Sequence, residues 1–183
     1  ALRSALAALP VSQERTAPEC QVRLHAEAQP RVEEEALDVT QGKLALGFRT
    51  GGVTCWEEDY PALVMCNAIF GGTTLSKLFL NVREKLSLCY YASSMYHRQK
   101  GIITVSSGIE FQNYQRAYDE ILSQLAAVQN GELEEWELAG ARSTLLNSYA
   151  TVGDSQGKLE NFYLGQAATG RSETPADLAQ AVM

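Results

Sequence analysis

The spacing of apolar residues along the chain alternates in some stretches and follows a helical repeat in others. Alternation predicts half-buried strands at 20–29 and 43–50, the second with Leu44, Leu46 and Phe48 on one face. Two more strands are predicted at about 88–96 and 101–110. The polar, glycine-containing segment 97–101 between them has the length of a hairpin loop.

Apolar residues three and four positions apart predict helices in the remaining stretches. One begins near Asp59 and ends at Gly71, and the next crosses 75–86 with a cap at Thr73 or Thr74. A clear helix follows over 113–129. In the helix at 133–151 the spacing places Trp136 and Ala139 inward. Helices around 159–167 and from Thr174, where Thr174 and Asp177 have the form of a capping box, complete the chain.

The order of these elements predicts an α+β fold with a largely antiparallel sheet and helices packed on one face. Strands lead, short connections join them, and a helix-rich half follows. Residues 1–19, which include Pro10 and a polar stretch, are expected to be a linker and the end of a preceding helix. Residues 20–183 are expected to form one α+β domain, whose last helix should continue beyond Met183.

Composition narrows the possible partners of this domain. The 183 residues are 45% hydrophobic and 20% charged, as in soluble globular proteins, and the formal net charge of −7 argues against nucleic acid as a partner. No apolar run approaches the roughly 20 residues that span a bilayer, and no signal peptide is recognised, so no membrane partner is expected. Four cysteines without paired spacing fit a reducing cytoplasm: Cys20, Cys55, Cys66 and Cys89.

Motifs for catalysis by this chain itself are missing from the sequence. His25 and His97 stand in neither an H-x-x-E-H nor an H-E-x-x-H frame, and are expected to be exposed or hydrogen-bonded histidines. The sequence has no G-x-S-x-G elbow and no phosphate-binding glycine loop. We therefore expect no catalytic residue, no metal and no other cofactor in this chain.

The most distinctive stretch runs from Phe70 to Tyr91. It contains Gly71-Gly72, Ser76-Lys77-Leu78-Phe79, Val82-Arg83-Glu84-Lys85 and Leu88-Cys89-Tyr90. These segments resemble the signature of the M16 metallopeptidases, the insulinase and mitochondrial processing peptidase family. The usual Gly-Leu-Ala-Tyr ending is Ser87-Leu88-Cys89-Tyr90 here. The resemblance continues through segments 41–49, 59–63 and 132–146, and so covers most of the chain.

The resemblance implies the C-terminal, zinc-lacking half-unit of the M16 fold, most like bacterial inactive zinc-dependent peptidases. In that family, the residues that match Arg83 and Tyr90 reach across a chamber to a peptide held on the zinc-bearing half. A guanidinium and a phenol can both donate to a peptide carbonyl. The alternative is structural: Arg83 pairs with a nearby carboxylate, and Tyr90 fills the sheet face.

The function expected from the resemblance is a non-catalytic, substrate-binding half that closes a peptide chamber, with zinc belonging to the partner half. Its partners would be a peptide or unfolded polypeptide and either an N-terminal M16 half or a paralogous M16 subunit. An exposed sheet edge would accept the substrate as an added strand. Two alternatives are a pseudo-peptidase that scaffolds a catalytic M16 subunit and a structural core-type subunit of a larger complex.

Overall fold

The computed structural model describes residues 4, 7, 8, 26, 27 and 29–183. The expected linker at 1–19 and most of the expected strand at 20–29 lie outside these residues. Residues 26, 27 and 29 are described and belong to no strand.

Three antiparallel strands form the sheet in the described part of the chain. They are β1 (Gly42–Arg49), β2 (Cys89–His97) and β3 (Ile102–Ile109), in the order β1-β3-β2. Val105 in the central strand lies between Leu46 and Ser94. β2 and β3 are joined by the short loop predicted from the sequence, and its Gly101 has a φ of 59°. All three strands therefore lie where the sequence predicted them.

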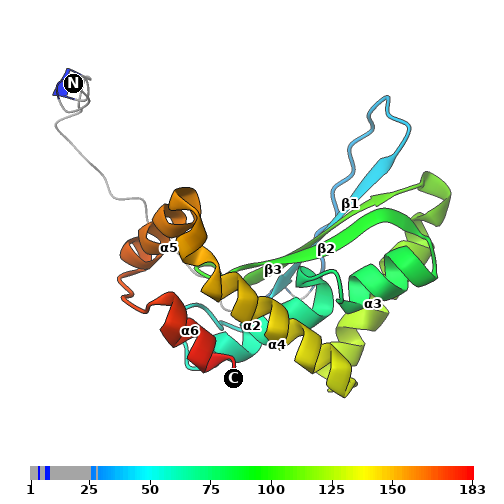
Figure 1. Ribbon diagram of the computed structural model, residues 1–183. Coiled ribbons are helices and arrows are strands. Elements are labelled where there is room, and N and C mark those ends of the chain that lie inside the picture. The colour runs from blue at the N-terminus through cyan, green and yellow to red at the C-terminus, as the bar shows by residue number, and fades with distance from the viewer. Residues whose placement is uncertain (1–3, 5–6, 9–25, 28) are drawn as a thin grey trace.

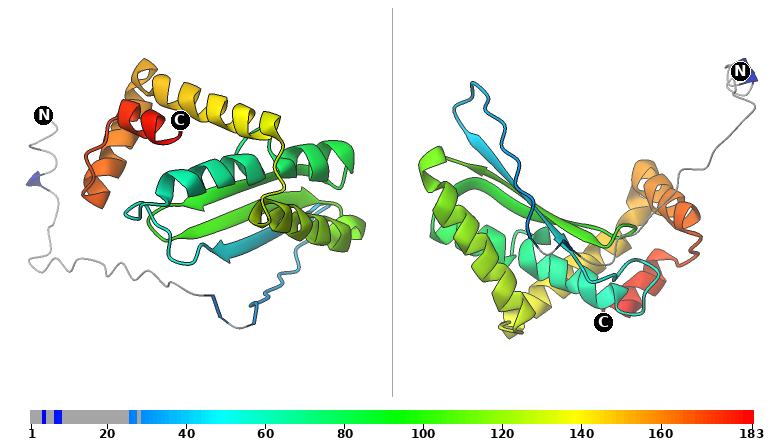
Figure 2. Two further views of the ribbon diagram at one scale, coloured as in Figure 1. Left: turned by 90° about the horizontal axis from the view of Figure 1, so that it is seen from below. Right: turned by 180° about the vertical axis from the view of Figure 1, so that it is seen from behind.

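The α-helices are α2 (Tyr60–Asn67), α3 (Tyr114–Gln129), α4 (Glu135–Ala150), α5 (Gln156–Thr169) and α6 (Pro175–Ala181). Two π-helices, η1 (Ala68–Gly72) and η2 (Leu78–Lys85), and two 3₁₀ turns, η3 (Phe111–Asn113) and η4 (Val152–Asp154), complete the helical elements. The first of these elements, α2, η1 and η2, come between β1 and β2, and the remaining helices follow β3. The helices that cover the sheet lie on one of its faces, whereas α5 and α6 lie beyond its end, at the far end of α4 (Figures 1 and 2). The expected α+β architecture is confirmed.

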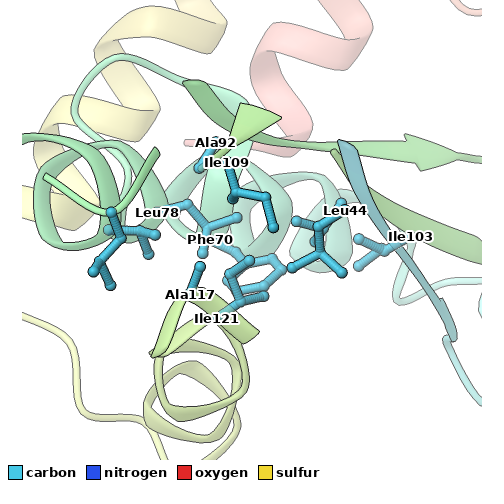
Figure 3. Close-up of a cluster of buried hydrophobic side chains, with 11 residues drawn as sticks. Leu44, Phe70, Leu78, Ala92, Ile103, Ile109, Ala117 and Ile121 are labelled. Atoms are coloured by element: carbon cyan, nitrogen blue, oxygen red, sulfur yellow. The ribbon is translucent and has the colours of Figure 1, made fainter. Parts of the chain in front are cut away.

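The main core lies between the sheet and the first helical layer (Figure 3). Phe70 in the middle of η1 meets Ile121 of α3 and the inward face of the sheet. Apolar burial of this kind contributes about 25 cal/mol per Å² and is the main favourable term in folding. The buried members are Leu44, Phe70, Leu78, Val82, Leu88, Ala92, Ile103, Val105, Ile109, Ala117 and Ile121.

The helix expected across 75–86 differs from the prediction. It is a π-helix over Leu78–Lys85, in which the Leu86 amide donates to the carbonyl of Asn81. Neither threonine caps it, because Lys77 is the residue at its N-terminus. In a π-helix the hydrogen bonds join residues five apart instead of four, so the residues that share one face differ from those predicted for an α-helix. Leu75 lies before this helix and Leu86 directly after it, and both are exposed, whereas Leu78 and Val82 within it are buried.

The inward face predicted for the helix at 133–151 is also wrong at its start. Trp136 and Ala139 are exposed, and the buried residues of α4 are Glu137 and Ala141. Glu137 was not among the residues predicted to face inward, and in the structure it forms a buried ion pair with Lys77.

Candidate functional site

Arg83 lies in the last turn of η2 and is held from two sides. Its Cζ lies 4.6 Å from the centroid of the Phe79 ring, one π-helical turn earlier, and Nη1 lies 3.4 Å from Oε1 of Glu84. The arginine side chain is 37% exposed and the glutamate side chain 54%. Exposed ion pairs are weak, so stacking on the ring is the contact that orients the guanidinium. The carboxylate partner considered from the sequence is present but leaves the guanidinium partly open to solvent.

Tyr90 occupies a β-bulge at the beginning of β2. Cys89 pairs with Ile109 and Tyr91 with Gly108, which leaves Tyr90 as the extra residue between two partners. A bulge turns a side chain out of the regular alternation. The Tyr90 side chain is 74% exposed, so it does not fill the sheet face.

Neighbouring residues of β3 fix the bulge. The hydroxyl of buried Ser107 donates to the carbonyl of Tyr91 at 2.9 Å. A Cβ on Gly108 would lie 2.6 Å from the Tyr91 ring, so the glycine makes room for that ring. The direction of Tyr90 is therefore set by backbone and packing rather than by contacts of its own.

A short turn leads directly from Arg83 into β2. The Ser87 amide donates to the Arg83 carbonyl at 3.1 Å, the Leu88 amide donates to the Val82 carbonyl at 3.0 Å, and Ser87 has a φ of 51°. Burial raises the pKa of the Cys89 thiol at the beginning of β2, while the Ser107 hydroxyl and the positive charge of Arg83 act in the opposite direction.

A hollow of about 420 Å³ lies beside Phe79. It lies between the loop after η1, the edge strand β2 and helix α4. Phe79, on which Arg83 stacks, is part of its wall. The lining residues are Gly71, Gly72, Thr73, Thr74, Phe79, Ala92, Ser93 and Thr144.

The described residues do not fit a metal site. No cluster of three or more His, Cys, Asp or Glu side chains that could hold an ion occurs among them. His97 is hydrogen-bonded, with Nε2 2.9 Å from Oγ1 of Thr104, and His25 lies outside the described residues. Burial is the main cause that raises the thiol pKa of Cys55 and Cys66, as it does for Cys89, so none of the three is an activated nucleophile.

A second hollow of about 530 Å³ lies where the loop before α2 meets the loop before α6. Two of the charged residues that line it, Arg171 and Glu173, are engaged in internal contacts. Arg171 pairs with Glu173, and its Cζ lies 5.2 Å from the Tyr60 ring centroid. We therefore assign these contacts to packing of the C-terminal helices rather than to a ligand.

Sequence reasoning missed the residues that support Arg83 and Tyr90. Phe79 was expected to be part of an apolar stripe, and Ser107 and Gly108 to be ordinary strand residues. The available signal was Gly108 itself, because a glycine inside a strand marks a bulge or a close approach. Glu137 carried no signal, since a buried charge cannot be recognised before its partner is known.

The chain resembles known proteins both in sequence and in fold. Residues 2–145 match the family model described as the Peptidase M16 inactive domain. The Bacillus subtilis protein named "Probable inactive metalloprotease YmfF" is 42% identical over 140 residues, which is 76% of this chain and 33% of that protein. A crystal structure of a conserved protein from Enterococcus faecalis is 34% identical, with a TM-score of 0.70 over 79% of this chain and 34% of the other.

A further solved structure, the peptidase M16 inactive domain from Pseudomonas fluorescens, shares the fold at 20% identity. Its TM-score is 0.56, over 79% of this chain and 38% of the other. Fold and family match define a peptidase-like α+β domain, and no cluster of side chains that could hold a metal ion occurs among its described residues. The chain belongs to the M16 peptidase family, and the part of the family that it matches is the inactive domain. It spans about a third of the length of YmfF and of the Enterococcus protein.

Proposed function

We propose that this chain is the substrate-binding, non-catalytic half of an M16-type protein, and that it holds an extended polypeptide with Arg83 and Tyr90. The observation that carries this proposal is the position of the two side chains. The guanidinium of Arg83 is stacked on Phe79, which lines the 420 Å³ hollow. The phenol of Tyr90 is exposed at the beginning of β2, and the turn between η2 and β2 is closed by a hydrogen bond from the Ser87 amide to the Arg83 carbonyl.

The chemistry of the pair suits a peptide backbone. The guanidinium offers donors in fixed directions, and the phenol hydroxyl offers one more, so both can bond to carbonyl oxygens. In the described part of the chain β2 is an edge strand, and its Ala92 and Ser93 line the hollow. We place the peptide along this edge, where an added strand gains main-chain hydrogen bonds and its side chains enter the hollow.

The wider setting is part of the same proposal. Residues 20–183 form the domain, 1–19 lead into it, and the partner is an N-terminal M16 half or a paralogous M16 subunit. Any catalytic zinc belongs to that partner. A cytoplasmic setting is supported by three free thiols in the described part of the chain: Cys55, Cys66 and Cys89. None of the described helices has the length and apolar character that a bilayer crossing requires.

The proposal is tested by peptide affinity in the intact protein, with fluorescein-labelled β-casein as an unfolded polypeptide and anisotropy as the readout. Arg83→Ala should weaken binding about tenfold or more, because a charged hydrogen bond contributes about 1.5–3 kcal/mol. Tyr90→Phe should weaken it by a few-fold, since a neutral hydrogen bond contributes roughly 1 kcal/mol. Both variants should unfold within about 0.5 kcal/mol of the unchanged protein, as surface substitutions do.

Matched controls separate the site from general charge and aromatic effects. Arg116→Ala removes an exposed arginine from α3, and Tyr163→Phe removes a hydroxyl from a half-exposed tyrosine of α5. Neither should change β-casein affinity. Equal affinity in Arg83→Ala and Arg116→Ala would contradict the proposal, and loss of folding in Arg83→Ala or Tyr90→Phe would assign that residue a structural role.

A second candidate is a pseudo-peptidase that scaffolds a catalytic M16 subunit. It is favoured by the match to an inactive domain and by the similarity to a protein named as an inactive metalloprotease. Casein hydrolysis by the intact protein with added zinc, abolished by a chelator, would exclude it. The structural core-type subunit remains the third reading, and isolation in a stable membrane complex would favour it.

A further inference from the structure

A buried ion pair joins helix α4 to the beginning of η2. Nζ of Lys77 lies 3.0 Å from Oε1 of Glu137, and the two side chains are only 10% and 5% exposed. The second carboxylate oxygen of Glu137 accepts the amide hydrogen of Glu134 at 2.9 Å, which closes the capping box of α4. Both oxygens therefore have partners, and the geometry of the pair is fixed at the α4 end.

The same face of α4 makes further close contacts with the segment before η2. A Cβ on Gly140 would lie 2.9 Å from Cδ1 of Leu75, so the helix approaches this loop as closely as a glycine permits. Ala141 is buried in a cluster with Ala68 and Ile69 of η1, and Thr144 lines the hollow. One face of α4 thus contacts the segment before η2, packs on η1 and contributes to the lining of the hollow.

Lys77 stands directly before the first residue of η2, two residues before Phe79 and six before Arg83. A π-helix of eight residues is rare and holds its shape only where the surroundings impose it. A buried ion pair contributes little net stability over an apolar contact of similar volume, but it fixes direction and register because only one arrangement satisfies both charges.

We propose that Lys77 and Glu137 are positioning residues for the peptide-binding site: their ion pair sets the start of η2 and so places Phe79 and Arg83 at the hollow. This inference rests on the proposed function for its consequence in binding. The control of η2 by the ion pair does not depend on the proposed function, because it is inferred from the contacts of Lys77 and Glu137. It is measured separately, by amide hydrogen exchange.

The experiment compares three variants of the intact protein. Lys77→Met with Glu137→Gln removes both charges but keeps similar volumes, and glutamine still accepts the Glu134 amide hydrogen. Lys77→Arg keeps the charge and the donor. Lys158→Met removes an exposed lysine from α5 as a control. The readouts are amide hydrogen exchange over 78–88, the thermal midpoint, and the affinity for fluorescein-labelled β-casein.

In the double variant we expect a thermal midpoint near that of the unchanged protein and faster amide exchange confined to η2 and the turn after it. The affinity for β-casein should fall about tenfold, because small misplacements of binding groups have large effects. Lys77→Arg and Lys158→Met should match the unchanged protein in all three readouts. If the double variant does not fold, Glu137→Gln alone provides the same exchange comparison.

Unchanged exchange over η2 in the double variant, or in Glu137→Gln where only that variant folds, would overturn the positioning role whatever the affinity. Unchanged affinity in the double variant, while Arg83→Ala binds weakly, would overturn it as well. Faster exchange together with wild-type affinity in Arg83→Ala would instead leave the ion pair's control of η2 in place and refute the proposed function.

Discussion

Ser87 shows how one residue can connect the sequence signature to backbone geometry. It occupies the turn between η2 and β2 with a φ of 51°, in the left-handed region where a side chain is strained. The M16 pattern usually has glycine at this position. The glycine is explained by the conformation, because a residue without Cβ adopts positive φ without the steric penalty.

Replacing Ser87 by glycine should therefore stabilise the protein. We expect a gain of about 1 kcal/mol in the free energy of unfolding, from relief of the left-handed strain. Ser106 is exposed in β3, where glycine weakens a strand, so Ser106→Gly should lower stability by roughly 0.5–1 kcal/mol. Urea denaturation measures both, and a Ser87→Gly variant no more stable than Ser106→Gly would refute the explanation.

The elements were predictable to different degrees. The alternating strands and the amphipathic α3 depend on period alone, so their positions were predicted well. The stretch after Gly72 was predicted as an α-helix because sequence periodicity does not distinguish i+4 from i+5 hydrogen bonding over two turns. The π-helix packs against α3 as well as β2, and Lys77 just before it pairs with Glu137 of α4, so two of these three neighbours are distant in sequence. The bulge at Tyr90 depends in the same way on Ser107 and Gly108.

Gly71 is a second element-scale feature, since it lets η1 pack directly against η2 and β2. A Cβ there would lie 2.7 Å from Cδ1 of Leu78 and equally close to the backbone nitrogen and Oγ of Ser94. Gly71→Ala should cost roughly 1–3 kcal/mol, as overpacking of a core does. Gly153→Ala is the matched control, because nothing lies within 4 Å of the added carbon. Equal stability of the two variants in urea would contradict this account.

At the scale of the whole molecule, the described part of the chain contains no group of three or more His, Cys, Asp or Glu side chains that could hold a metal ion. We predict that the 183 residues, expressed alone in soluble folded form, contain no stoichiometric zinc. Elemental analysis after dialysis without chelator measures this directly, with a zinc-containing peptidase as the positive control. One tightly held zinc per chain would refute the prediction and would direct attention to His25, which lies outside the described residues.

The C-terminal helices are tied to the rest of the molecule by Arg171, which pairs with Glu173 and lies over the ring of Tyr60 in α2. The hydrogen bond from Arg171 holds the pKa of Glu173 below its usual value. A carboxylate whose pKa is lower in the folded state than in the unfolded state stabilises the folded protein. The stabilisation is fully present at pH values above the unfolded-state pKa of about 4.3. It is lost as the pH falls through the lower pKa of the folded state. Solvent screening of the partly exposed pair keeps the effect to about 1 kcal/mol or less.

Glu173→Gln should therefore be less stable than the unchanged protein at pH 7, and the difference should shrink as the pH falls below about 4. Urea denaturation at several pH values measures the difference. Glu33→Gln is the control, because the Arg31–Glu33 pair is 81% and 75% exposed and should contribute little at any pH. A constant difference between Glu173→Gln and the unchanged protein from pH 7 to pH 3 would show that Glu173 acts through packing or hydrogen bonding, and not through its charge.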